Sequence, residues 1–170
     1  MNKENDVNSI IDKLGSYQIL TNLFPGTFFG VGLSFFFNLE FQTKSIVEDL
    51  IIYYFMGFII SRIGSLFVEP ILKKIHFLRL SSYSDFIFAC KNDIKIDTLS
   101  EINNYMRSLL TSTLMLLLIG GVQKKICESI WFLDNWRLLL LIFISIILLL
   151  SYRKQTSYIQ KRVEAFHNRE

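Results

Sequence analysis

Four long, weakly charged stretches constrain the fold of this chain more than any other feature of its sequence. The last stretch is the most extreme, because residues 138–150 consist of Leu, Ile, Phe and one Ser. A run of about 18 or more mostly apolar residues is typical of a membrane-spanning helix. A helix that is apolar on every side lies in lipid or in a large core, and 170 residues are too few to bury four of them. We therefore expect an all-α integral membrane protein with four transmembrane helices.

The composition agrees with this expectation. The chain is 51% hydrophobic with a mean hydropathy of +0.38, whereas a soluble domain is usually less apolar and more highly charged. Pro25 and Gly26 leave two starts open for the first span, near Tyr17 or near Leu23. The sequence shows no internal repeat or linker, so residues 1–170 are treated as a single transmembrane domain. The four predicted spans cover residues 23–41, 46–67, 106–122 and 136–152.

Residues 5–22 are predicted to form an amphipathic helix, because their apolar and polar side chains fall on opposite faces at helical spacing. We expect this helix to lie in the membrane interface before Pro25 redirects the chain. The alternative is one long kinked helix that begins near Tyr17. Residues 1–16 carry five charged side chains and no small-residue cleavage site, so a cleavable signal peptide is not expected.

The cytoplasmic loop, residues 69–105, is predicted to be largely helical. Pro70 is expected to end the helix of the second span, because proline removes a backbone donor and clashes with the preceding turn. Ser84 is the predicted N-cap of a short helix over residues 85–91.

A second helix is predicted to start in the same loop and to run without a break into the third span. Its start signal is a capping box, with Thr98 as N-cap and Glu101 three residues later. The basic tail, residues 153–170, is expected to continue the fourth helix into the cytoplasm.

The distribution of basic residues predicts that both termini are cytoplasmic, in a multi-pass protein of the bacterial inner membrane. With four spans, the termini and the central loop share one side, and this side carries 14 of the 18 Lys and Arg residues. The other side carries the remaining four, which are Lys44, Lys124, Lys125 and Arg137.

Small residues form one face of the second predicted span. They fall at positions i, i+4, i+7 and i+8, and they are Gly57, Ser61, Gly64 and Ser65. Small residues let helix backbones approach closely in a membrane. Two interpretations stay open: packing inside one subunit, or a subunit–subunit or pore-lining helix.

Arg62 lies inside the same predicted span, where a charge is costly and marks a candidate functional site. It is expected either to snorkel or pair with Glu69 or Asp85, or to act in gating or ligand binding. In the third span, the hydroxyls of residues 111–113 are expected either to bond to carbonyls of their own helix or to line a water-filled path.

The sequence offers no catalytic set. Its two histidines, His76 and His167, have no second ligand at metal-binding spacing, and we expect no cofactor and no enzymatic activity. The predicted spans contain no carboxylate away from their ends, which disfavours a proton-coupled transporter.

The stretches YQILTNLFPG at 17–26 and ISRIGSLFVEPILK at 60–73 resemble small four-span bacterial proteins of antiviral defence operons. The size and topology are similar to the membrane subunits of systems such as Hailong and Kiwa. The resemblance implies a homo-oligomeric effector that permeabilises the inner membrane on a signal and thereby halts the infected cell. It also implies a cytosolic defence partner.

The leading functional expectation is therefore an oligomeric membrane effector or ion channel, with a tetramer favoured, that responds to a cytoplasmic signal. A basic patch is the expected binding surface for an anionic signal, such as a nucleotide or a short nucleic acid. The alternative for this patch is ordinary cytoplasmic charge, and the alternative function is a non-conducting membrane sensor or scaffold that recruits a cytosolic partner. The patch comprises Lys73, Lys74, Arg79, Lys91 and Lys95.

Overall fold

The computed structural model describes residues 15, 17, 19–39, 43, 45–126 and 135–167, and every regular element in this part of the chain is a helix. The predicted all-α class is therefore confirmed for these residues. Most of the predicted amphipathic helix, residues 5–22, lies outside them. The elements are the π turns η1 (Ile19–Leu23) and η2 (Gly64–Val68) and the helices α2 (Phe24–Phe37), α3 (Ile46–Ile63), α4 (Glu69–Lys74), α5 (Tyr83–Asn92), α6 (Ile94–Ile126) and α7 (Asn135–His167).

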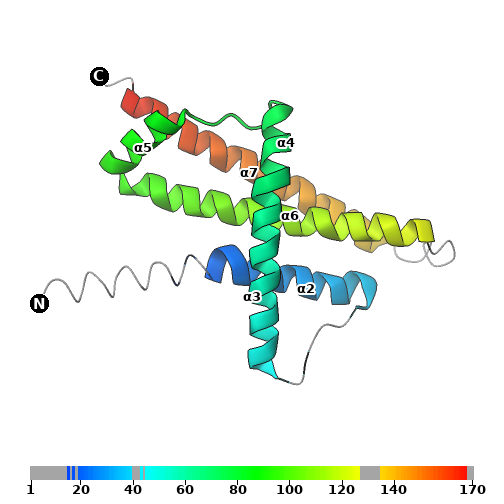
Figure 1. The fold of residues 1–170 in the computed structure, drawn as a ribbon. Coiled ribbons are helices and arrows are strands. Elements are labelled where there is room, and N and C mark those ends of the chain that lie inside the picture. The colour runs from blue at the N-terminus through cyan, green and yellow to red at the C-terminus, as the bar shows by residue number, and fades with distance from the viewer. Residues whose placement is uncertain are drawn as a thin grey trace, which may run out of the picture.

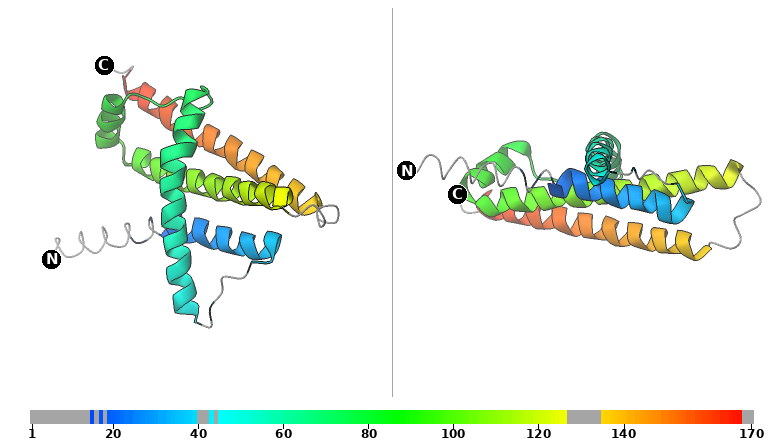
Figure 2. Two further views of the ribbon diagram at one scale, coloured as in Figure 1. Left: turned by 45° about the vertical axis from the view of Figure 1, so that its right-hand side comes forward. Right: turned by 90° about the horizontal axis from the view of Figure 1, so that it is seen from below.

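Three helices form a layer and a fourth lies across it (Figures 1 and 2). Helices α2, α6 and α7 lie side by side, with α7 antiparallel to α6. The elements α3, η2 and α4 follow one another without a break and form one helix, Ile46–Lys74, which we call the crosswise helix. It passes over α2, then α6, then α7 (Figure 1).

Among the described residues, two helices are long and apolar enough to cross a bilayer, namely Ile46–Lys74 and Arg137–Ala165, with 29 residues each. Only 17% of the apolar window of each is buried inside the protein, whereas the core helix of a soluble protein would be mostly buried. These helices indicate association with a membrane. The prediction of four spans is not confirmed, and because the two helices lie crosswise, one copy in this conformation can align only one of them with the membrane normal.

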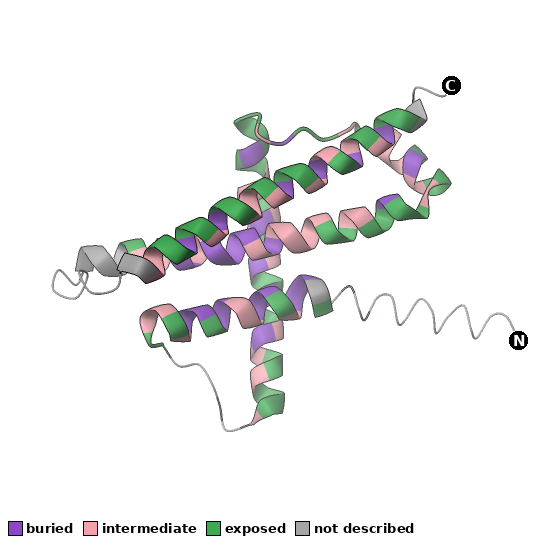
Figure 3. Cartoon of the chain, turned by 180° about the vertical axis from the view of Figure 1, so that it is seen from behind, coloured by how far each residue is buried: buried purple, intermediate pink, exposed green. Residues whose placement is uncertain are grey.

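The α6–α7 hairpin has an apolar half and a polar half. The apolar half comprises residues 106–121 and 137–152, and the polar half comprises residues 94–105 and 153–165. Helix α5 packs on the polar half through a small core of Ala89, Ile96, Ile159 and Val163. Figure 3 shows that the outward face of α7 is exposed. The exposed side chains of α3 and of the apolar half of α7 are largely apolar.

The first predicted span, residues 23–41, starts and ends later in the chain than the helix that forms. Helix α2 ends at Phe37, because Asn38 takes a left-handed conformation with φ 55°. Asparagine tolerates this conformation better than most residues, and one such residue terminates a helix. Helix α2 follows η1 without a break, so together they form one helix over residues 19–37.

Neither proline interrupts its helix, so the predictions that Pro25 redirects the chain and that Pro70 ends a helix are wrong. Pro25 lies in the first turn of α2, directly after η1, and Pro70 lies in the first turn of α4, directly after η2. A π turn accommodates one extra residue. It thereby relieves the clash that a proline ring would make with the carbonyl of the preceding turn.

Two predicted helix starts are also wrong. Helix α5 is capped by Ser82 rather than Ser84, since the Ser82 hydroxyl accepts a hydrogen bond from the Asp85 amide at 3.2 Å. Helix α6 begins at Ile94, where Asp93 accepts from the Lys95 amide, so that Thr98 lies inside the helix. The helix does run unbroken into the third predicted span, as the sequence indicated.

Candidate functional site

The crosswise helix meets α2 through two glycines. A Cβ atom on Gly57 would lie 1.7 Å from the Asn22 carbonyl oxygen, and one on Gly26 would lie 1.8 Å from the Tyr53 carbonyl oxygen. Both distances are far shorter than any contact between real atoms, and both neighbours are backbone. Glycine is therefore required at each position, because only glycine lets the two backbones approach this closely.

The next crossing, with α6, uses another small residue and the hydroxyl cluster. A Cβ atom on Gly64 would lie 2.6 Å from the Thr111 hydroxyl. That hydroxyl donates to the Arg107 carbonyl at 2.8 Å, and the Ser112 hydroxyl donates to the Pro25 carbonyl at 3.1 Å. The crosswise helix thus approaches α6 closely at Gly64, and the Ser112 hydroxyl joins α6 to α2.

The small-residue face of the second predicted span thus packs within the chain. Gly57 and Gly64 are buried against α2 and α6, which corresponds to the interpretation of packing inside one subunit. Ser61 and Ser65 are half-buried, and the Ser65 hydroxyl donates to the Arg62 carbonyl at 2.9 Å. The two glycines are therefore unavailable to a second subunit in this conformation.

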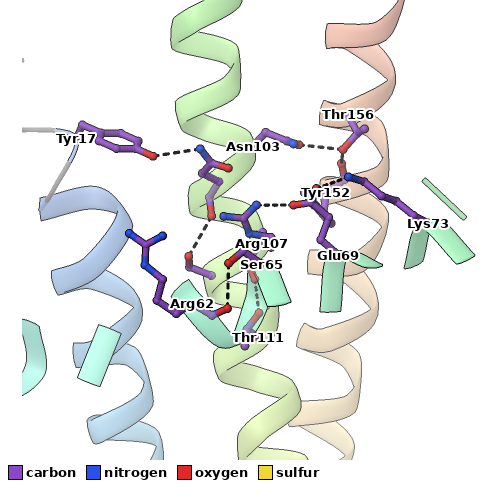
Figure 4. Close-up of polar contacts among 12 residues, drawn as sticks. Tyr17, Arg62, Ser65, Glu69, Lys73, Asn103, Arg107, Thr111, Tyr152 and Thr156 are labelled. Carbon is purple, nitrogen blue, oxygen red and sulfur yellow. Dashed lines mark hydrogen bonds and ion pairs between the residues drawn. The ribbon is translucent and has the colours of Figure 1, made fainter. Parts of the chain in front are cut away.

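A buried ion pair lies where the crosswise helix reaches α7 (Figure 4). The Arg107 guanidinium from α6 donates to Oε2 of Glu69 in α4, and their side chains are 13% and 17% exposed. Lys73 Nζ lies 2.7 Å from the other carboxylate oxygen, Oε1. The Tyr152 hydroxyl of α7 lies 3.5 Å from Oε2. We call these four residues the Glu69 cluster.

Helix α6 is the centre of the polar contacts around this cluster. Asn104 donates to the Tyr17 hydroxyl at 3.1 Å, and Asn103 accepts from the Thr156 hydroxyl at 3.0 Å (Figure 4). Within little more than one turn of α6, three polar side chains therefore contact three different segments of the protein. A displacement of α6 would change the geometry of all three contacts.

Arg62 does not take part in the Glu69 cluster. Its side chain is exposed, and its guanidinium carbon lies 5.2 Å from the centre of the Phe58 ring. The predicted pairing of Arg62 with Glu69 is wrong, because Glu69 binds Arg107 and Lys73 instead. Sequence reasoning missed Arg107 as a functional residue, although it is a charge at the inner end of the third predicted span and carried the same signal as Arg62.

From the sequence, Glu69 is expected only as a candidate partner of Arg62, and not as a carboxylate inside a long apolar helix. The second predicted span ends at residue 67 and has no carboxylate away from its ends. The helix that forms continues to Lys74 and therefore contains Glu69. The i, i+4 spacing of Glu69 and Lys73 was the available signal, since such pairs interact on one helix face. The partner from α6 is 38 residues away in sequence, and nothing in a single sequence connects the two.

The hydroxyls of the third predicted span are engaged with backbone carbonyls. Ser108, Thr111, Ser112 and Thr113 are buried, and each donates to a carbonyl of its own helix at 2.8–3.1 Å. This is the geometry expected of Ser and Thr in a helix interior. It favours the structural interpretation of these residues over a water-filled path.

The predicted basic patch divides into two groups. Lys73 and Lys74 end α4 and Arg79 follows in the connection 75–82, whereas Lys91 and Lys95 lie at the corner between α5 and α6. Figure 1 shows α4 at the top of the crosswise helix, at the α7 edge of the layer, and α5 at the left end of the hairpin. The structure therefore does not gather the five residues into one surface, and Lys73 is already paired with Glu69.

The polar half of the hairpin has its own ion pair. Asp93, at the start of α6, accepts from the Arg162 guanidinium of α7, and this hydrogen bond holds the pKa of Asp93 below its ordinary value. Burial, together with the neighbouring Asp97 carboxylate, raises the pKa of the Cys90 thiol to about 11. This thiol is therefore protonated at neutral pH and is a poor nucleophile.

Comparisons with protein-family models, with curated proteins and with solved structures found no match. Among the described residues, no group of three or more His, Cys, Asp and Glu side chains is placed to hold a metal ion. The chemistry that the geometry offers is electrostatic: a carboxylate and two cations join α4 to α6, and the Tyr152 hydroxyl adds α7 at the same crossing.

Proposed function

We propose that this protein is an inner-membrane effector in which the crosswise helix is held by the Glu69 cluster and released by a cytoplasmic signal. The observation that carries the proposal is the position of this helix. It is long and apolar enough to cross a bilayer, yet it lies across the helices that it contacts and is pinned to them by a buried ion pair.

In the proposed membrane arrangement, the α6–α7 hairpin crosses the bilayer with its apolar half. Its polar half, together with α5, stands in the cytoplasm, and both termini are cytoplasmic. The Glu69 cluster then lies at the inner membrane surface, because Tyr152 marks the end of the apolar half of α7. A signal received by the cytoplasmic part can reach the cluster along α6, which is one unbroken helix from Ile94.

The energetics suit a switch. Removing one partner of a buried ion pair costs about 3–5 kcal/mol, because the other charge is left without compensation. This cost is large enough to hold the helix at rest. It is also small enough for a bound ligand to offset, since moving an equilibrium from 1:99 to 99:1 takes about 5.5 kcal/mol of differential binding.

In the released state, the apolar crosswise helix is proposed to insert beside the hairpin and to open a leak or pore in a homo-oligomer, with a tetramer favoured. Following the resemblance to defence proteins, the consequence in the cell would be abortive infection. A cytosolic defence partner, a nucleotide or a short nucleic acid remains the proposed source of the signal.

A non-conducting sensor or scaffold is the second candidate, and one observation favours it. The hydroxyls of residues 111–113 and the two glycines of the crosswise helix are all engaged within the chain. The α5–α6–α7 end meanwhile has its own packed core, as a docking platform for a soluble partner requires.

Dye release from liposomes tests the proposal. Wild-type protein and the Arg107→Gln and Arg62→Gln variants would be reconstituted with an encapsulated fluorescent dye. Arg107→Gln breaks the Glu69 cluster and is expected to leak without any signal. Arg62→Gln is the control: it removes an exposed arginine of the crosswise helix that lies outside the Glu69 cluster, and it is expected to behave like wild type.

Three outcomes decide between the candidates. Leakage confined to Arg107→Gln, or wild-type leakage that begins only when a partner is added, supports the effector. Tight binding of a cytosolic partner with intact liposomes under every condition overturns it in favour of the scaffold. Equal leakage from both arginine variants shows that any loss of charge opens the membrane, and thus contradicts the role assigned to the cluster.

A further inference from the structure

The chain that follows α4 is held in a fixed turn against the hairpin. His76 takes a left-handed conformation with φ 58°, and the Phe77 amide donates to the Leu72 carbonyl at 3.0 Å. This pattern is a Schellman motif, which commonly closes helix C-termini. Leu78, which is 4% exposed, then packs with Leu72 and Tyr152. The residues around this turn therefore have defined positions.

One basic residue contacts Phe77, and two others lie within three residues of it in the chain. The guanidinium carbon of Arg153, from α7, lies 4.7 Å from the centre of the Phe77 ring. Lys74 precedes Phe77 by three residues, Arg79 follows it by two, and both side chains are exposed. In the part of the chain that the structure describes, the recorded ion pairs give none of these three cations an acidic partner.

Exposed apolar side chains lie among these cations. Ile71 is 57% exposed, Ile75 is 61% exposed and Leu80 is 46% exposed. A site for a soluble anion has no need of such residues, whereas a segment at a membrane surface buries its apolar side chains in lipid and directs its cations to the headgroups. The mixture of the two therefore points to lipid.

The position of the turn along the hairpin agrees with this interpretation. Arg153 directly follows Tyr152, where the apolar half of α7 ends. The turn that contains Phe77 packs against Tyr152 through Leu78. The three cations are thus at the level at which the phosphates of the inner leaflet would lie in the membrane arrangement proposed above.

We infer that the surface formed by Lys74, Phe77, Arg79 and Arg153 binds the phosphate headgroups of anionic lipids in the inner leaflet. Each basic residue near an anionic membrane surface contributes a favourable electrostatic interaction, and the exposed isoleucines and Leu80 supply contact with the acyl chains. The binding would hold the end of α4 at the membrane surface beside the Glu69 cluster. The inference rests on the proposed membrane placement, but it does not depend on release of the crosswise helix.

A lipid titration of the full-length protein in neutral detergent tests the inference. Short-chain phosphatidylglycerol, short-chain phosphatidylcholine and inorganic phosphate would be added separately, and adducts would be counted by native mass spectrometry. The site variant is Lys74→Gln/Arg79→Gln/Arg153→Gln. A matched control, Lys91→Gln/Lys95→Gln/Lys161→Gln, removes the same charge from exposed residues in the cytoplasmic part. A milder variant, Lys74→Gln/Arg79→Gln, leaves the packing of Arg153 on Phe77 intact.

Wild type and the control are expected to prefer phosphatidylglycerol, and the site variant is expected to lose about a hundredfold in affinity for it. The milder variant should show a smaller loss in the same direction. Equal loss in site variant and control, no preference in wild type, or equally tight binding of inorganic phosphate would each overturn the inference. Lipid preference that persists in a protein that never leaks liposomes would refute the effector proposal and leave this inference standing.

Discussion

The crosswise helix and α7 contain candidate spans of equal length and similar apolar character, yet the protein uses them in different ways. Each provides 29 residues that could cross a bilayer, and each buries 17% of its apolar window. Helix α7 lies along α6 as the second arm of a hairpin, whereas the crosswise helix passes over α2, α6 and α7 in turn (Figure 2). Apolar character therefore sets which segments avoid water, but it does not set their direction.

The difference between the two helices lies in their few small and charged residues. The crosswise helix has glycines where it meets α2 and α6, a π turn before Pro70, and the buried Glu69. The apolar half of α7 offers mostly large side chains instead and packs lengthwise, and its side-chain contacts with other helices through polar groups lie near its two ends, at Arg137 and at Tyr152. Close approach at isolated points favours a crossing, and a continuous apolar stripe favours a hairpin.

Breaking the ion pair of the crosswise helix should have the largest effect on stability. Arg107→Ala leaves Glu69 buried without its α6 partner, which is expected to lower the free energy of unfolding by about 3–5 kcal/mol. Thermal or denaturant unfolding in detergent measures this change. Combining it with Glu69→Ala in a double-mutant cycle should give strongly non-additive effects. Arg62→Ala, the control, should stay within about 0.5 kcal/mol of wild type, and an equal loss at Arg62 would contradict the assignment.

Adding a single methyl group at the α2 crossing should have the next largest effect. Gly57→Ala places a Cβ atom 1.7 Å from the Asn22 carbonyl oxygen, which forces the two backbones apart and is expected to cost about 3 kcal/mol. Gly121→Ala is the control, because a Cβ atom there meets nothing within 4 Å. The same unfolding assay compares the two variants. Equal stability of both would show that α3 does not contact α2 at Gly57.

The ion pair that joins α7 to the start of α6 should have the smallest effect, and that effect depends on pH. Hydrogen bonding to Arg162 lowers the pKa of Asp93 from its ordinary value of 3.8. A carboxyl with a depressed pKa contributes stability above its ordinary pKa and loses this contribution as the pH falls through its lowered value. The protection of amides in α5 and at the end of α7, measured as hydrogen exchange relative to the intrinsic rate at each pH, should therefore be constant near neutral pH and should fall below about pH 4.

The Arg162→Gln variant checks the cause of that loss of protection. The protection of its amides at neutral pH should already be as low as that of the acidified wild type, and it should depend less on pH. An unchanged pH profile in this variant would assign the effect to another carboxylate.

Much of the helical content was predictable, because it follows from local patterns. The apolar run 138–150 predicted α7, and the helix that leads into the third predicted span was expected to be continuous, as α6 is. The starts of α5 and α6 were placed wrongly, since Ser82, Ser84, Asp93 and Thr98 are all acceptable caps. Helices that start at neighbouring cap residues differ little in free energy, so the packing of the adjacent segments decides which residue becomes the N-cap.

The candidate site was only partly predictable. The glycines of the second predicted span were recognised, and packing within one subunit was one of the two interpretations, but Arg62 was chosen over Arg107. Both are arginines near the end of an apolar stretch. Arg107 points towards Glu69 across a helix crossing, and Arg62 points outward to Phe58, and this difference depends on how the helices are rotated about their axes.

The sequence by itself determined that this chain is helical, that long parts of it avoid water and that its charge is concentrated at particular ends of its helices. These properties follow from hydropathy and from spacing along the chain, which are local. The tertiary structure decided that the crosswise helix lies over its neighbours, that Pro25 and Pro70 continue their helices, and that Glu69 meets Arg107. These features depend on contacts between segments that are remote in sequence. At one contact there is no room for a Cβ atom, so only glycine fits, and at another a buried carboxylate needs a cationic partner.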